Sequence, residues 1–180
     1  FASNEAYFRL EGKDSNGKPM AGGEVYVDIN NLIDYMLSIF YTGNFDAPTS
    51  SFGGNKGPNN FFAINDRTDK SEGFKFFNHD AEHSIFSEPA NPGIGLLEDR
   101  VNLADNDYGP DMRVDNFSAF HPQWLHHRLT DNAEYRVRFM DRAYEMVSPG
   151  GVLTPEKNED RLIRRANEIY YALVAESARW

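Results

Sequence analysis

The chain has 180 residues and a formal net charge of −10, lacks cysteine, and is 40% hydrophobic, which is enough apolar material for a folded core. This length fits one domain or one lobe of a larger domain, so residues 1–180 are treated as a single domain. The acidic charge argues against nucleic acid or an anionic membrane surface as a partner. The missing cysteines exclude a disulfide framework and a cysteine-ligated zinc site. No apolar run approaches the roughly 20 residues that span a bilayer.

The first third of the sequence predicts an extended segment, a loop and a helix. Residues 6–10 are expected to form a short strand or extended arm, and the Gly, Asn, Pro and Asp content of residues 12–23 is typical of a loop. Residues 28–41 carry apolar side chains at helical spacing, which predicts a helix with a wide buried face. Asp28 or Asn30 is its expected N-cap, and Gly43 its expected end.

The middle of the chain predicts a β-hairpin that follows a loop. Residues 44–58 are rich in Gly, Ser, Pro and Asn, whereas residues 60–64 and 74–78 are predicted strands on either side of a polar turn. The aromatic residues of these two strands are expected to belong to the core. They are Phe61, Phe62, Phe74, Phe76 and Phe77.

The last third predicts a long loop and then helices. Residues 87–112 show little periodicity, and a loop of this length is usually functional. Residues 124–129 form a short predicted helix in which His126 and His127 are expected to be a solvated end. Residues 131–134 have capping-box spacing ahead of a helix that runs to residue 147, and residues 154–155 begin a final helix that runs to about residue 180. The predicted fold class is therefore α+β and mostly helical.

Three polar positions around the predicted hairpin are candidates for a chemical site. Asp46 lies on a loop just past the first long helix, Asn59 and Asn60 precede the first strand, and Asp80 follows the second strand. Phosphoryl transfer needs such a set, because one Asp orients or deprotonates the accepting hydroxyl while hard oxygen ligands hold Mg²⁺. The alternative is that these residues serve turns and caps, as most Asp and Asn residues in loops do.

Three sequence blocks resemble the C-terminal, catalytic-loop portion of the spore-coat-protein-H (CotH) family of atypical protein kinases. They occur in the same order as in that family. The blocks are residues 31–46, residues 59–63 with 76–84, and residues 176–180. The resemblance implies a C-lobe-like part of a diverged protein-kinase fold. It also implies phosphoryl transfer from ATP, dependent on Mg²⁺ or Mn²⁺, to Ser or Thr of protein substrates that are secreted or on the cell surface, where this chain is then expected as well.

The resemblance also implies roles for individual residues. Asp46 would be the catalytic Asp, while Asn60 and Asp80 would bind the metal ion and, through it, the nucleotide. His79 and Glu82 would be supporting groups.

The sequence departs from the family pattern in two ways. In the family the metal-binding Asn follows the catalytic Asp closely, whereas here Asn60 comes after a Gly-rich insertion, so that Ser50 or Ser51 is an alternative and weaker ligand. A Gly-rich nucleotide loop and a strand-borne Lys with a matching helical Glu are not found, and the N-lobe is therefore predicted to be missing. Whether this portion is active alone is left open. The first residues show no signal-peptide pattern and predict a piece cut from a longer chain.

Two further functions remain open at this stage. His79, Glu82 and His83 satisfy the His-x-x-Glu-His pattern of inverted zinc peptidases, with Glu159 as a third ligand. That pattern requires a helix, whereas a strand and then a loop are predicted here. The other possibility is a non-catalytic surface module in which Asp46 and Asp80 only bind a cation or stabilise loops.

Overall fold

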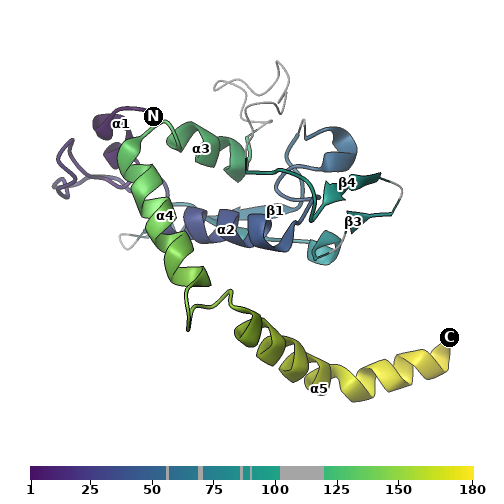
Figure 1. Cartoon of the computed structure of the whole chain (residues 1–180). Helices are drawn as coiled ribbons and strands as arrows, with labels where there is room; N and C mark the ends of the chain where they lie inside the picture. The colour runs from purple at the N-terminus through teal and green to yellow at the C-terminus, as the bar shows by residue number, and fades with distance from the viewer. Residues whose placement is uncertain (56, 69–70, 86, 90, 102–119) are drawn as a thin grey trace. The chain divides into compact units, whose positions relative to one another are not determined.

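The computed structural model describes residues 1–55, 57–68, 71–85, 87–89, 91–101 and 120–180. The fold is α+β, with helices and two small antiparallel sheets of two strands each (Figure 1). The chain divides into two compact units, residues 1–139 and residues 140–180, and α4 (Ala133–Val147) runs from the first into the second.

Helix α2 (Ile29–Thr42) is the central element of the first unit, and its ends are those that the sequence predicts. The Asp28 carboxylate accepts a hydrogen bond from the Asn31 backbone N–H at 3.0 Å, which caps the first turn. Gly43 ends the helix in the left-handed conformation, with φ +58°. This conformation favours glycine, because other residues pay a steric penalty there.

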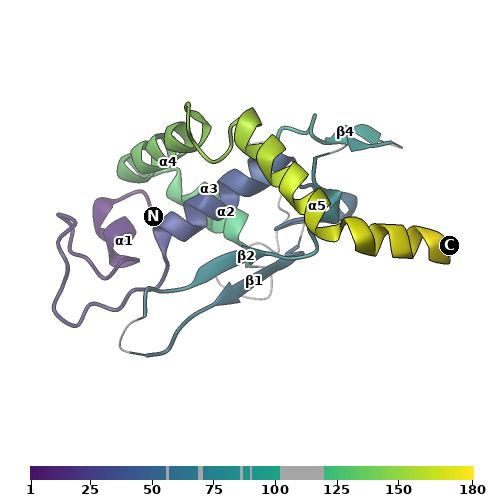
Figure 2. The same cartoon turned by 90° about the horizontal axis from the view of Figure 1, so that it is seen from below.

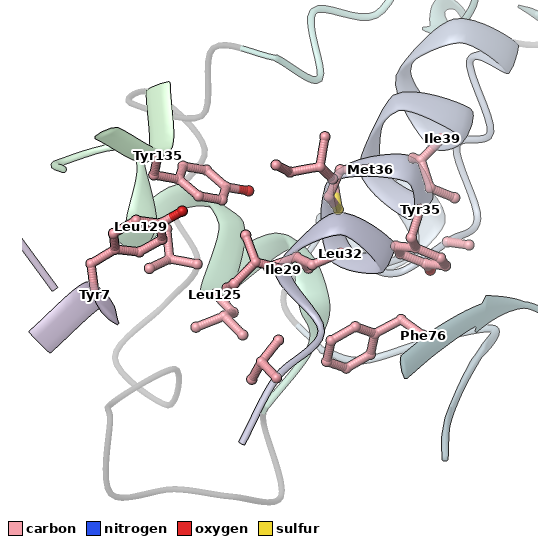
Figure 3. Packing of buried hydrophobic residues seen from close by; sticks show 13 residues of the cluster. Tyr7, Ile29, Leu32, Tyr35, Met36, Ile39, Phe76, Leu125, Leu129 and Tyr135 are labelled. Carbon is pink, nitrogen blue, oxygen red and sulfur yellow. The ribbon is translucent and has the colours of Figure 1, made fainter. Parts of the chain in front are cut away.

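The core forms around α2 because its apolar face is wide enough to meet neighbours on both sides. In Figure 3, Leu129, Tyr7 and Tyr135 lie on one side of the helix and Phe76 lies on the other. The buried α2 side chains are those of Ile29, Leu32, Ile33, Tyr35, Met36 and Ile39. This packing fixes the position of the chain that leaves α2 at Gly43.

Strands β1 (Phe61–Ile64) and β2 (Lys75–Asn78) form the predicted hairpin, with Phe62 paired to Phe77, and lie along α2 (Figure 2). The Asn31 side chain attaches the hairpin to the helix, because its Oδ1 accepts from the Phe76 N–H at 2.5 Å and its Nδ2 donates to the Phe76 carbonyl at 3.2 Å. The hairpin therefore keeps a defined position relative to the end of α2.

The prediction that all five hairpin phenylalanines belong to the core is wrong. Phe76 is buried and Phe61 packs partly against the core, whereas the other three are exposed. For Phe62 and Phe77, which are paired across the hairpin, the reason is the alternation of side chains along a strand, since the opposite face carries Phe61 and Phe76 against the core. Phe74 precedes β2 and forms an isolated bridge with Val27. The exposed residues are Phe62, Phe74 and Phe77.

The predicted strand or arm at residues 6–10 is also wrong, because this segment belongs to helix α1 (Asn4–Arg9). The Ser3 hydroxyl caps α1 by accepting from the Ala6 N–H at 3.2 Å. Tyr7 is fully buried, with its ring 6.0 Å from that of Tyr135 in an edge-on contact. Tertiary packing of this one aromatic side chain holds a helix too short to be recognised by periodicity.

The predicted loop over residues 87–112 contains a short hairpin, made of β3 (Ser87–Glu88) and β4 (Asn91–Gly95). Residues 96–101 continue from it, and the remainder of the predicted loop lies outside the described residues. The described part of this unit also contains two short 3₁₀ turns, η1 (Ser51–Gly53) and η2 (Ala81–His83).

Helices α3 (Pro122–Leu129) and α4 confirm the two predicted helices. The N-cap of α4 lies one residue later than the capping-box spacing indicates, since Asn132 Oδ1 accepts from the Tyr135 N–H at 3.1 Å. The prediction of a solvated His126 is wrong, because its ring is buried and its Nδ1 lies 2.7 Å from the Tyr135 hydroxyl.

The second unit contains the end of α4 and the predicted final helix, α5 (Pro155–Arg179). Gly150, with φ +89°, turns the chain between them, and the Leu153 N–H donates to the Met146 carbonyl at 2.8 Å. Thr154 is the predicted N-cap residue of α5, but its hydroxyl donates to the Gly151 carbonyl instead of capping the helix. Among the helices that the structure describes, none is long and apolar enough to cross a membrane.

Candidate functional site

The backbone of Asp46 is held on both sides by asparagine side chains. Asn44, which is almost fully buried, accepts from the Asp46 N–H through its Oδ1 at 3.1 Å. Asn59 donates from its Nδ2 to the Asp46 carbonyl at 2.8 Å. Phe45, between Asn44 and Asp46, is fully buried and anchors the segment in the interior. These contacts fix the main chain at the candidate catalytic residue.

Two further side chains hold the Asp46 carboxylate. Asn60 donates from its Nδ2 to Asp46 Oδ2 at 2.8 Å, and the Ser50 hydroxyl donates to Asp46 Oδ1. Asp46 is partly buried, and both of its carboxylate oxygens are oriented by hydrogen bonds. Hydrogen bonds to an ionised carboxylate are stronger than those between neutral groups. The structure therefore brings Asp46 and Asn60 into direct contact, as the predicted site requires.

Asn59 is a site residue whose role the sequence pattern does not reveal. In the sequence it is only the neighbour of Asn60, yet it bonds the Asp46 carbonyl while Asn60 bonds the Asp46 side chain. The sequence feature that could have indicated this role is the Asn-Asn pair, because two consecutive asparagines just before a strand place two side-chain amides close together. Each amide donates to Asp46 through nitrogen and keeps its carbonyl oxygen as a possible acceptor.

Asp80 precedes η2 as its N-cap residue, two positions past the end of β2. It is exposed, and its backbone is left-handed, with φ +51°. In the part of the chain that the structure describes, its side chain forms no hydrogen bond with Asp46 or Asn60. Its segment is nevertheless attached to both of theirs. The His79 N–H donates to the Asn60 carbonyl at 3.3 Å, and the Phe45 N–H donates to the His83 carbonyl at 3.4 Å.

The two alternative serine ligands differ in their partners. Ser50 contacts Asp46, whereas the Ser51 hydroxyl lies 2.8 Å from both carboxylate oxygens of Glu98 and accepts from Arg100 at 2.7 Å. Ser51 therefore belongs to a neighbouring polar cluster. The Gly-rich insertion closes on itself, since Thr49 and Pro58 form an isolated β-bridge at its ends. This closure brings Asn60 back to Asp46 despite the insertion.

The His-x-x-Glu-His residues make separate contacts. The His79 ring meets Phe62 edge-on at 4.6 Å, whereas the His83 ring packs 4.9 Å from Phe45. Glu82 Oε1 lies 3.8 Å from His83 Nε2. Only residues 81–83 are helical, in a single 3₁₀ turn, so His79 and His83 do not share a helix face. Within the described ranges, no group of three or more His, Asp or Glu side chains could hold a metal ion.

The candidate residues are of the types whose side-chain oxygens can serve as Mg²⁺ ligands. Carboxylate and amide oxygens are the hard ligands that Mg²⁺ prefers, and this ion commonly uses one or two carboxylates together with waters and phosphate oxygens. Asp46, Asp80 and the two asparagine amides supply that chemistry from three segments.

Comparisons with known proteins add no assignment: no protein-family model matches the chain, and no curated protein or solved structure does.

Proposed function

We propose that this chain is the catalytic-loop, C-lobe-like portion of an atypical protein kinase of the CotH type. Its site would transfer the γ-phosphoryl group of ATP to a Ser or Thr hydroxyl of a protein substrate that is secreted or on the cell surface. Asp46 is assigned as the base, and Asn60 and Asp80 as ligands of Mg²⁺ or Mn²⁺. Asn59 joins them as the residue that fixes the Asp46 backbone.

The observation that carries the proposal is the pair of contacts from Asn59 and Asn60 to Asp46. If the loop served only as a turn, contacts from two consecutive asparagines to one aspartate, across an insertion, would not be expected. The resemblance assigns Asp46 and Asn60 to one site, and their contact in space supports that assignment independently of the sequence order.

In this proposal the Asp46 carboxylate receives the proton of the substrate hydroxyl. Ser50 occupies Asp46 Oδ1, so the substrate hydroxyl would replace Ser50 at that oxygen. Asn60 holds the other carboxylate oxygen, Oδ2, by a hydrogen bond, which orients Asp46 and leaves Oδ1 to accept the substrate proton. The bound metal ion would neutralise phosphate charge, and catalysis would depend mainly on positioning.

The test is calorimetric titration of ATP into the chain with and without Mg²⁺, for the wild type, Asp80→Ala and Asp66→Ala. Asp66 is the matched control, because it is also an exposed loop aspartate but caps the hairpin turn by accepting from the Thr68 N–H at 2.9 Å. We expect Mg²⁺-dependent binding that Asp80→Ala abolishes and Asp66→Ala retains. Circular dichroism should show that Asp80→Ala is folded, since an exposed loop carboxylate adds little packing.

Two other results would contradict the proposal in different ways. Retained Mg²⁺·ATP binding in Asp80→Ala would remove the basis for this site. Binding of Mg²⁺ without ATP would favour the non-catalytic cation-binding module. The other form of that alternative, in which Asp46 only stabilises the loop, has its own support, because both carboxylate oxygens of Asp46 already accept hydrogen bonds from within the chain.

A further inference from the structure

Arg100 is the most deeply buried charged residue near the candidate site, with 3% of its surface exposed. It follows β4 in the sequence and lies far from Asp46 along the chain. A buried guanidinium is costly unless it is paired and hydrogen-bonded, so its burial requires a dense set of acceptors.

The loop after Asp46 provides most of those acceptors. Arg100 Nη2 donates to the Ala47 carbonyl at 3.2 Å and to the Thr49 carbonyl at 3.3 Å. Ala47 directly follows Asp46, and Thr49 directly precedes Ser50. The guanidinium therefore holds the main chain between the candidate base and the serine that contacts it.

A second group of contacts fixes Arg100 itself. Its Nη1 donates to the Ser51 hydroxyl at 2.7 Å and lies 3.5 Å from Glu98 Oε2, which provides a compensating charge. Gln123, at the start of α3, donates from Nε2 to the Arg100 carbonyl at 3.2 Å and is also buried. Three segments are thus joined at one guanidinium: the Asp46 loop, the chain after β4, and α3.

We propose that Arg100 is a positioning residue for the phosphoryl-transfer site, acting on Asp46 through the backbone of residues 47–49. This inference rests on the proposed function, because the site it serves is the one assigned above. Lys cannot replace Arg here, since a single ammonium lacks the planar fork that reaches two carbonyls and a hydroxyl together. A displacement of the base by about 1 Å is enough to impair a reaction that depends on positioning.

The experiment compares Arg100→Lys and Arg100→Met with Arg138→Gln in the whole chain. Arg138 is the matched control, because it is a half-buried arginine that bonds Tyr7 and Glu11, on the opposite end of α2 from Asp46. Thermal unfolding reports stability, and calorimetry reports Mg²⁺·ATP affinity at a temperature where every variant is folded. Amide ¹H–¹⁵N spectra follow the side-chain NH₂ signals of Asn59 and Asn60.

Both Arg100 variants should weaken Mg²⁺·ATP binding about tenfold or more, as loss of a supporting residue commonly does, and should shift both asparagine NH₂ signals. Arg138→Gln should lower the Tm and leave affinity and signals unchanged. If Arg100→Met does not fold, Arg100→Lys still decides. If folded Arg100→Lys keeps its Mg²⁺·ATP affinity and its Asn59 and Asn60 NH₂ signals unchanged, the role proposed for Arg100 is overturned. The proposed function is not affected by that result. A wild type that binds no Mg²⁺·ATP would overturn the proposed function and, with it, this inference.

Discussion

Asn60 Nδ2 lies 2.8 Å from Asp46 Oδ2, although a Gly-rich insertion separates the two residues in the sequence. Asn60 holds this position in the left-handed conformation, with φ +47°, which asparagine tolerates better than most residues. The contact joins the end of α2 to the start of β1. It connects the position of the candidate base to the hairpin that also leads to Asp80.

Asn60→Asp should therefore destabilise the chain by about 1–3 kcal/mol at pH 7, because it replaces a donor by a second carboxylate facing Asp46. The free energy of unfolding in urea measures the loss.

Asn65→Asp is the control for this substitution. Asn65 accepts a hydrogen bond from the Ser71 hydroxyl through Oδ1, and a carboxylate preserves that role. We expect less than about 0.5 kcal/mol of change there. Equal effects of the two substitutions would contradict a specific Asn60–Asp46 contact.

Gly43→Ala should destabilise the chain more than Gly22→Ala does. Both glycines have positive φ, of +58° and +69°, so both substitutions carry a backbone penalty of about 1 kcal/mol. A Cβ on Gly43 would lie 3.0 Å from the Leu96 Cα, whereas a Cβ on Gly22 has no heavy atom within 4 Å. The difference in urea unfolding free energy isolates this close approach, and equal losses would argue against packing of Leu96 on the end of α2.

Stability should fall as the pH falls from about 6.5 to 5, because two histidines are buried. Burial lowers the pKa of His126 to about 4, helped by the nearby His127 charge, and lowers the pKa of His121 to about 3, helped by the Arg100 charge. Between these values and the unfolded pKa of about 6.5, the unfolded chain binds more protons than the folded one, so protonation favours unfolding.

The free energy of unfolding should fall by up to about 1.4 kcal/mol for each pH unit and each histidine. His126→Gln keeps a polar partner for Tyr135 and should remove one of the two contributions between pH 6.5 and 5. A slope in the variant equal to that of the wild type would show that His126 is not buried in its neutral form.

Arg138→Gln should lower the free energy of unfolding by about 1–3 kcal/mol, because it breaks a partly buried network. Arg138 Nη1 donates to the Tyr7 hydroxyl at 3.1 Å and to both Glu11 oxygens at 3.0 Å. Arg136→Gln is the control, because Arg136 is exposed and donates to the Thr130 carbonyl on the surface. Equal losses would mean that Arg138 does not anchor α1.

Elements can be predicted from the sequence where their local signals agree. Helix α2 has a capping Asp28, an apolar period and a terminal Gly43, and the hairpin has two aromatic runs around a polar turn. Helix α1 was missed because six residues are too few for a period to be seen, and because burial of Tyr7 depends on residues far along the chain.

The candidate site could be predicted as residue types but not as an arrangement. Asp46, Asn60 and Asp80 were identified from their places around the hairpin. The return of Asn60 to Asp46 depends on how the insertion closes, and that loop packs around Arg100, about fifty residues later in the chain. No local pattern reports such a contact, because it is created by tertiary packing.

The most direct measurement of the central claim is paramagnetic broadening of ¹H–¹⁵N signals by Mn²⁺, with and without ATP. The account predicts that substoichiometric Mn²⁺ first broadens the Asn59 and Asn60 side-chain signals and the Asp46 and Asp80 amides, more strongly when ATP is present. Asp80→Ala should abolish this pattern. Broadening centred on other acidic residues, or unchanged by Asp80→Ala, would contradict a phosphoryl-transfer site at Asp46.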